Sequence, residues 1–322
     1  MSRVRPPEGV LRSPLGELVI RVKSKREVGM TTRRTDVVVL ACALFSVALL
    51  LLPGCAAKKA AAPGETALTL EYRLPKGTPV TYSNTQTSTQ TMEMMGQTMN
   101  VQTDRAMVFT LMPGEIKNNK QQMTVTIDSM QAQVTAPQGS FTADVSPVIG
   151  KSFEMSLSMT GKELDLSGAD LLQYSIGQAG QRTVKPDFQS MFPDLSGTPV
   201  KVGDTWTIRD TTYVNESGLA LTIMTESLDT LEGFETVGGV ECARIRGVIT
   251  GTATGAGEQQ GTQIAIDSKM NGTEVWLFAY KAGRLTKFDS DVSMDGTITL
   301  GGPQGMNMPM NQVMKTETVF VK

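Results

Sequence analysis

The chain has no histidine, and this absence restricts its chemistry. Without histidine there is no Ser-His or Cys-His dyad, and the usual protein ligand for zinc and copper(II) is missing. Acid–base catalysis would fall to carboxylates, lysine or tyrosine, and the sequence contains no arrangement of these that identifies a reaction. The composition therefore predicts a protein that is not an enzyme and holds no catalytic residues.

Cysteine is also scarce, with three residues in 322. Cys42 lies inside a hydrophobic segment near the N-terminus, and Cys55 directly follows that segment. If Cys42 is removed with the N-terminal segment and Cys55 is modified, Cys242 has no intramolecular partner, and no disulfide framework forms. Cys242 stands in "GGVECARIRGV", among β-type residues, where a small buried hydrophobic side chain is expected rather than a reactive thiol.

Basic residues are few outside the N-terminal region. Residues 1–54 hold nine Lys/Arg and four Asp/Glu, which leaves 21 basic and 28 acidic residues in the remainder, a formal charge of −7. Phosphate binding needs a basic face, so the sequence predicts no nucleic-acid partner.

A hydrophobic run of 16 residues, Val37–Leu52, follows Arg33 and Arg34 and ends at Pro53 and Gly54. A membrane-spanning helix needs about 20 apolar residues, so the length favours a signal peptide. "LPGC", Leu52-Pro53-Gly54-Cys55, resembles the lipobox of bacterial lipoproteins, although Pro53 is not the residue most usual at its place. The resemblance implies cleavage before Cys55 and acylation of its thiol. An uncleaved anchor, or a secretory signal with an unrelated cysteine, is the alternative.

The N-terminal region divides into three predicted segments. Residues 1–29 form an extension, because Met30 begins a better signal peptide, which runs over residues 30–54. Residues 55–66, "CAAKKAAAPGET", form a tether. In the lipoprotein sorting pattern an aspartate after the acylated cysteine retains the protein in the inner membrane, and here that residue is Ala56. The resemblance thus implies a protein on the outer membrane facing the periplasm. The membrane is then its partner, and no cofactor is expected apart from the covalent lipid on Cys55.

Apolar residues alternate with Thr, Ser, Gln and charged residues through most of residues 67–322, as in "MTVTIDSMQAQV" and "LALTIMTESL". This period of two is typical of antiparallel strands with one buried face. The predicted fold is an all-β antiparallel meander, either a duplicated open barrel or a curved sheet.

Two halves, residues 67–166 and 198–322, are predicted on either side of a short helical connection, residues 167–197. Ser167 or Asp170 is expected to cap its first helix and Pro186 to open its second. The glycine-rich "GTATGAGEQQGT", residues 251–262, is expected to be a flexible hairpin. "FPDLSGTPVKVGDTW", residues 192–206, resembles a segment of an uncharacterised β-rich bacterial lipoprotein family, which implies a β-rich fold and an envelope location but no reaction.

Two methionine-rich stretches, "TMEMMGQTM" and "GMNMPMNQVM", allow three interpretations. Thioethers are soft ligands that select Cu(I) or Ag(I). Alternatively, a turn at Met95–Gly96 would place Met92 opposite Met99, and the side chains would form an ordinary apolar stripe on one face of a sheet. A curved sheet lined by methionine would also suit an acyl chain or another apolar ligand. The candidate metal ligands are Met92, Met94, Met95, Met99, Met306, Met308, Met310 and Met314.

The sequence therefore predicts a membrane-anchored envelope lipoprotein that acts as a binding or scaffold module. A Cu(I)/Ag(I)-binding protein and a carrier of lipid or another apolar ligand are the alternatives. The identity of a protein or small-molecule partner does not follow from the sequence.

Overall fold

The computed structural model describes residues 66–322, except 95, 178–179, 217, 260 and 302–304. The chain divides into two compact units, residues 1–57 and 58–322, and the described residues all belong to the second. The predicted extension, signal peptide and tether, including Cys55, lie outside the described residues, apart from residue 66 of the tether. Met95 is outside them as well.

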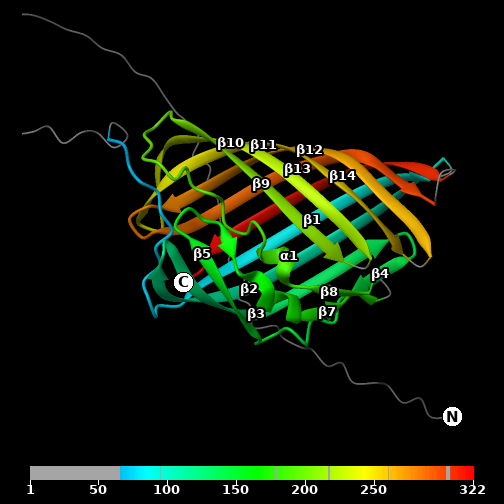
Figure 1. Cartoon of the computed structure of the whole chain (residues 1–322), viewed down its shortest axis with the longest axis horizontal. Helices are drawn as coiled ribbons and strands as arrows, with labels where there is room; N and C mark the ends of the chain where they lie inside the picture. The colour runs from blue at the N-terminus through cyan, green and yellow to red at the C-terminus, as the bar shows by residue number, and fades with distance from the viewer. Residues whose placement is uncertain (1–65, 95, 178–179, 217, 260, 302–304) are drawn as a thin grey trace, which may run out of the picture. The chain divides into compact units, whose positions relative to one another are not determined.

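The all-β prediction is confirmed. Long antiparallel strands form one curled, open sheet, a half-barrel (Figure 1). Its spatial order is β6-β5-β3-β2-β1-β14-β13-β12-β11-β10-β9, with β4 paired to β3. The strands are β1 (Val80–Met94), β2 (Gln97–Lys117), β3 (Lys120–Ala136), β4 (Gly139–Thr142), β5 (Ser152–Ser158), β6 (Glu163–Leu164), β9 (Thr205–Glu216), β10 (Leu219–Val237), β11 (Val240–Gln259), β12 (Thr262–Ala279), β13 (Arg284–Leu300) and β14 (Met306–Phe320).

Alternation decides which face of each strand is buried. In β3, Met123, Val125 and Ile127 are 0–1% exposed, and the residues between them face the other side. Successive side chains of a strand point to opposite faces, so the apolar set lies on the concave face. In β3 the opposite, convex face carries the polar residues Gln122, Thr124 and Thr126.

The first and last strands of the chain, β1 and β14, pair with each other in the middle of the sheet and form a seam there. Tyr82 lies opposite Phe320, and the buried Asn84 donates from Nδ2 to Oγ1 of Thr318 over 2.9 Å. Strands β1–β6 and β9–β14 thus occupy two consecutive blocks of the sheet with the same rotational order. A tandem duplication would give this arrangement, and the duplication itself stays a prediction.

The connection between the two blocks forms a second layer over one end of the concave face. It contains the 3-10 helix η1 (Leu166–Leu171), the hairpin of β7 (Gln173–Ser175) and β8 (Gln181–Thr183), and the single-turn helix α1 (Lys185–Phe188). Pro186 lies in the first turn of α1, as predicted. The predicted cap of the first helix is wrong, because η1 begins after Asp165, whose left-handed backbone (φ 60°) makes the turn without a side-chain cap.

Aromatic side chains fill the space between this connection and the sheet. The Phe188 ring meets Phe109 and Phe153 edge-on at centroid distances of 5.1 and 5.0 Å, and Trp276 is fully buried. Cys242 is also fully buried with a free thiol, as expected of a small hydrophobic residue. The core therefore lies at the end of the half-barrel where β2–β3, β10–β11 and β12–β13 turn.

Candidate functional site

A belt of mostly polar side chains crosses the concave face and separates the aromatic core from the opposite end. Its members lie at one level because each is the cross-strand neighbour of the next. In order from β2 to β9 they are Arg105, Gln86, Thr316, Ser290, Glu274, Gly247, Asp229 and Trp206. Asp229 and Thr318, the latter one level below, are only 2% and 1% exposed.

Beyond the belt, the concave face becomes apolar. Ile298, Met308 and Met310 are buried there, and Met92, Met294, Met306, Ile264, Ile266 and Leu300 pack against them as half-buried neighbours. We call these nine residues the methionine cluster. All of them come from β1, β12, β13 and β14, whereas the aromatic core has side chains from both the sheet and the connecting segment. In the described part of the chain, the cluster is thus a single layer.

The two methionine-rich stretches meet in this cluster. Met92 of β1 lies opposite Met99 of β2 on one side and opposite Met310 of β14 on the other. The predicted pairing of Met92 with Met99 is confirmed. Met306 and Met308 continue along β14 opposite Leu300 and Ile298. The methionines therefore lie among aliphatic side chains on one face, as the apolar-stripe interpretation requires.

The remaining metal candidates are placed less favourably. Met314 lies four residues beyond Met310 in β14. Gln86 donates from Nε2 to Sδ of Met314 over 3.0 Å. Gln90 similarly places Nε2 3.6 Å from Sδ of Met310. Met94 pairs with Gln97 in the hairpin, and Met95 is outside the described residues. For the described residues, no three His, Cys, Asp or Glu side chains gather as a harder metal site either.

Glycines let the strands of this region approach closely. The predicted hairpin at residues 251–262 is present, since β11 turns into β12 there, but its strand part is longer than expected: β11 continues to Gln259 and pairs with β10 through Gly251, Gly255 and Gly257. A Cβ on Gly255 would lie 2.3 Å from the carbonyl oxygen of Ala220, and one on Gly251 would lie 2.4 Å from that of Met224. The glycines therefore permit tight curling of a regular sheet instead of breaking the strand.

Two carboxyl groups of the belt meet above Gly247. A Cβ on this glycine would lie 2.5 Å from Oδ1 of Asp229 and 2.6 Å from Oε1 of Glu274. Ser227 donates from Oγ to Oδ1 of Asp229 over 2.5 Å and lies 3.2 Å from Oε1 of Glu274. Burial, reinforced by the charge of Asp229, raises the pKa of Glu274 to about 8, and burial likewise raises the pKa of Asp229. Two neighbouring buried carboxyls cannot both ionise cheaply, so the pair retains a proton near neutral pH.

A third buried carboxyl group, Glu163 of β6, binds the backbone of the connecting segment. Glu163 accepts from the backbone N–H groups of Phe192 (2.7 Å) and Ser190 (3.3 Å), and burial raises its pKa to about 8. Burial raises the pKa of the nearby Asp194 to about 6, with Lys162 opposing the shift. Lys162 itself pairs with Asp210 of β9 at 2.9 Å. This contact joins the turn between β5 and β6, at one end of the sheet, to β9 at the other end.

The sequence analysis missed these buried acids. The signal that could have found them is their position in the period-two alternation of each strand. Glu274 stands between Gly272 and Trp276 at inward-facing positions of β12, and Asp229 occupies the inward-facing position before Leu231 in β10. A carboxylate in register with buried apolar residues marks a group that tertiary structure must neutralise.

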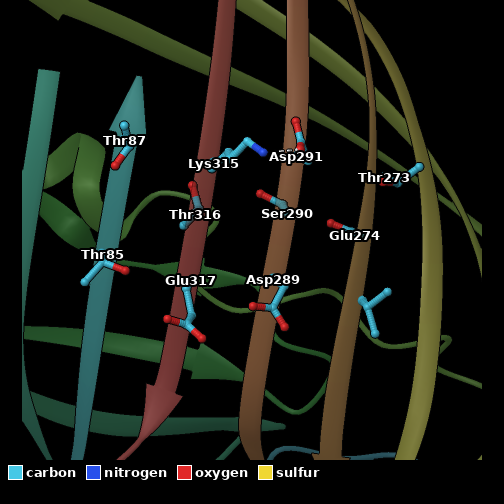
Figure 2. A pocket seen from close by; sticks show the side chains of 11 residues that line it. Thr85, Thr87, Thr273, Glu274, Asp289, Ser290, Asp291, Lys315, Thr316 and Glu317 are labelled. Carbon is cyan, nitrogen blue, oxygen red and sulfur yellow. Dashed lines mark ion pairs between the residues drawn. The ribbon is translucent and has the colours of Figure 1, made fainter. Parts of the chain in front are cut away.

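The convex face carries a shallow polar pocket of about 430 Å³ over β1, β14, β13 and β12. Figure 2 shows Lys315 extending toward Asp291, with which it pairs at 3.0 Å, and Glu317 beside Asp289. Lys287 bridges Asp289 and Glu317 at 3.0 Å each. These charges are largely satisfied by one another and exposed to water, so the pocket is a solvated ion-pair ladder.

Comparison with known proteins gives no family. No family model and no curated protein matches the chain. Matching solved structures include Pseudomonas aeruginosa OccK8 (OprE), with 6% identity, 78% of this chain and 100% of that chain covered, and a TM-score of 0.20. A BenF-like porin from Pseudomonas fluorescens Pf-5 matches with 6% identity, 76% and 100% coverage, and a TM-score of 0.19. Likenesses at such TM-scores support no conclusion about function.

Within the described ranges, none of the helices is long and apolar enough to cross a bilayer.

Proposed function

We propose that this chain is a lipid-anchored protein of the bacterial cell envelope whose half-barrel binds an apolar ligand, such as an acyl chain, on the methionine cluster. The observation that carries the binding role is the single-layer cluster: nine apolar side chains share a concave face, and all belong to the sheet itself. Methionine is unbranched and polarisable, so it adapts to flexible apolar ligands. The polar belt beside the cluster would set the depth to which such a ligand enters.

The location rests on the sequence. The lipobox-like Leu52–Cys55 supports acylation of Cys55, and Ala56 supports the outer membrane facing the periplasm. Two or three acyl chains hold a protein stably on a membrane, since each buried CH₂ contributes about 0.8 kcal/mol. Binding rather than catalysis fits a chain without histidine. If a Cys55→Ala chain kept the fatty-acid label and the electrophoretic mobility of wild type, the proposed lipid anchor on Cys55 would be refuted.

Photolabelling in cells tests the ligand. Cells that produce the full chain receive a fatty acid carrying a diazirine and are then irradiated, and the labelled peptides are mapped by mass spectrometry. We expect light-dependent adducts on peptides that contain Met92 and residues 294–310, whereas label on Cys55 needs no light. The double variant Met92→Gln/Met306→Gln should lose these adducts. Its matched control, Met112→Gln/Met224→Gln, changes two exposed methionines of the convex face and should keep them. Equal labelling of both variants would refute the binding role.

A soft-metal site is the second candidate, because Met99, Met92 and Met310 are direct neighbours across three strands. Three thioethers suffice to favour Cu(I) if their sulfurs converge. Anaerobic titration with Cu(I) against a competing chelator tests it. Affinity that survives Met92→Leu unchanged would exclude this site.

A further inference from the structure

Uncharged polar side chains lie between the belt and the methionine cluster. Gln90 of β1 stands directly opposite Gln312 of β14, and Ser88 occupies the inward position of β1 next to Gln90. All three are half-buried on the concave face, and we call them the uncharged band. The next inward residues beyond the band, Met92 and Met310, belong to the methionine cluster. A ligand whose apolar chain lies on the cluster therefore brings its polar end to the band.

The charged residues of the same strands lie on the opposite face. Between the belt and the cluster end, the described residues of β1, β12, β13 and β14 carry charges only at positions that alternate outward, and all of these side chains are exposed. These residues are Glu93, Asp267, Lys269, Asp291, Asp295 and Lys315. Asp291 and Lys315 are seen in the convex pocket of Figure 2. The concave side of these strands thus offers a ligand no counter-ion of either sign.

The charged residues of the belt are engaged with other parts of the chain. Arg105 pairs with Asp187, whose side chain is 3% exposed, and donates from Nη2 to Oε1 of Gln86 over 2.9 Å. A ligand anion that took Arg105 from Asp187 would leave a buried carboxylate unpaired, which is strongly unfavourable. Glu274 and Asp229 meet each other and Ser227. A charged polar end would therefore be buried without a counter-ion.

The uncharged band can nevertheless form hydrogen bonds with a ligand. Gln90 directs Nε2 at Sδ of Met310 over 3.6 Å, and a thioether sulfur is a weak acceptor that a ligand oxygen can replace. Gln312 donates from Nε2 to Oγ of Ser88 over 2.7 Å. Among the described residues, none donates to Oε1 of Gln90 or of Gln312. Amides and hydroxyls both donate and accept, so the band suits a hydroxyl, an ester or an amide.

We propose that the methionine cluster binds acyl ligands whose polar end is uncharged, such as an alcohol, an ester or an amide, and that Gln90 and Gln312 bind this end. The assignment rests on the apolar-ligand function proposed for the cluster and adds the chemistry of the ligand's other end. Removing an ion from water without a counter-ion costs far more than removing a hydroxyl or an ester, so the band selects against carboxylates and ammonium groups alike. Because cells esterify the fatty acid they are given, labelling in cells does not distinguish these polar ends.

Photolabelling with two matched probes tests the polar end. Isolated membranes that carry the full chain receive either a long-chain alcohol with a diazirine in its chain, or the sulfate ester of the same alcohol, which carries a permanent negative charge. Adducts on peptides that contain Met92 and residues 294–310 are quantified after irradiation. Division by the labelling of total membrane protein corrects for unequal partitioning. We expect the alcohol to exceed the sulfate on these peptides on the order of tenfold.

Gln90→Lys places a cation in the uncharged band and should raise labelling by the sulfate relative to the alcohol. The matched control is Gln102→Lys, which adds the same charge at an exposed position of β2 on the convex face. Its ratio of sulfate to alcohol labelling should equal that of wild type. Equal ratios in the two variants would show that the band does not meet the polar end of the ligand.

The wild-type comparison needs no substitution, so it decides the proposal even if Gln90→Lys does not fold. Equal labelling of wild type by the two probes, or stronger labelling by the sulfate, would overturn the assignment of an uncharged end and leave the cluster as an apolar site. Absence of adducts from both probes would instead overturn the ligand-binding function itself, and this assignment with it.

Discussion

Asp229 and Glu274 extend their carboxyl groups toward each other from the two strands that flank Gly247. Only a residue without a side chain fits between them. Ser227 donates to the first carboxyl and lies within reach of the second, so a retained proton completes a buried network. This arrangement makes the stability of the half-barrel depend on pH.

Stability should fall as pH rises from about 4.5 to about 8. Glu274 has an ordinary pKa of 4.5 when unfolded and about 8 when folded, so in this window the folded chain binds more protons. The contribution is complete below the unfolded pKa and is lost as pH rises through the folded pKa. Each pH unit between these values is worth at most about 1.4 kcal/mol per proton.

Urea unfolding of wild type and Glu274→Gln at pH 5, 7 and 9 measures this effect. The amide mimics the protonated acid, so the variant should lose less stability between pH 5 and pH 9. Glu163, whose pKa is also raised to about 8, will preserve part of the slope. The control is Glu93→Gln at an exposed position of β1. Identical slopes for wild type and Glu274→Gln would contradict the shared-proton arrangement.

Gly247→Ala should destabilise the protein by about 1–3 kcal/mol, because its Cβ collides with both carboxyl groups. Gly233→Ala is the matched control, since a Cβ at this glycine of β10 meets no atom within 4 Å. That substitution should be neutral or slightly stabilising. The measurement is the difference between their urea midpoints, and equal midpoints would count against the clash.

Asp187→Ala should cost about 3 kcal/mol, because it removes the partner of Arg105 in a buried ion pair. The Asp187 side chain is 3% exposed and that of Arg105 is 18% exposed. Asp170→Ala breaks the ion pair with Lys185 at the same end of the molecule, but there the carboxylate is 45% exposed. It should cost less than about 1 kcal/mol. Comparable losses in thermal or urea unfolding would show that burial of the Arg105 pair is unimportant.

Gln121→Leu should detach the segment that precedes β1. Buried Gln121 accepts from the N–H of Leu74 at 3.0 Å and donates to the carbonyl oxygens of Leu74 (2.7 Å) and Gly114 (3.2 Å). Loss of these bonds leaves buried backbone groups unpaired, at about 1–3 kcal/mol each. Faster hydrogen exchange at residues 70–75 is the expected readout. Gln122→Leu, on the exposed side of the same strand, should leave exchange there unchanged.

The sequence was sufficient for the strands and for the methionine stripe, because period-two alternation depends only on which face is buried. It was insufficient for how far β11 extends into the hairpin at residues 251–262, because glycines are typical of a turn but here face neighbouring strands at close range. It also missed Asp229 and Glu274, whose neutralisation depends on contacts between three strands. The predicted cap of the first helix failed for a local reason, since the left-handed Asp165 starts η1 without a side-chain hydrogen bond.

The seam between β1 and β14 has a consequence for biosynthesis. The N–H of Thr81 donates to Lys322, and Thr81 in turn accepts from Val321, so residues about 240 positions apart hold one another. The ribosome releases β1 long before β14 is available. The two blocks of strands therefore cannot join into one sheet until the last strand of the chain has been synthesised.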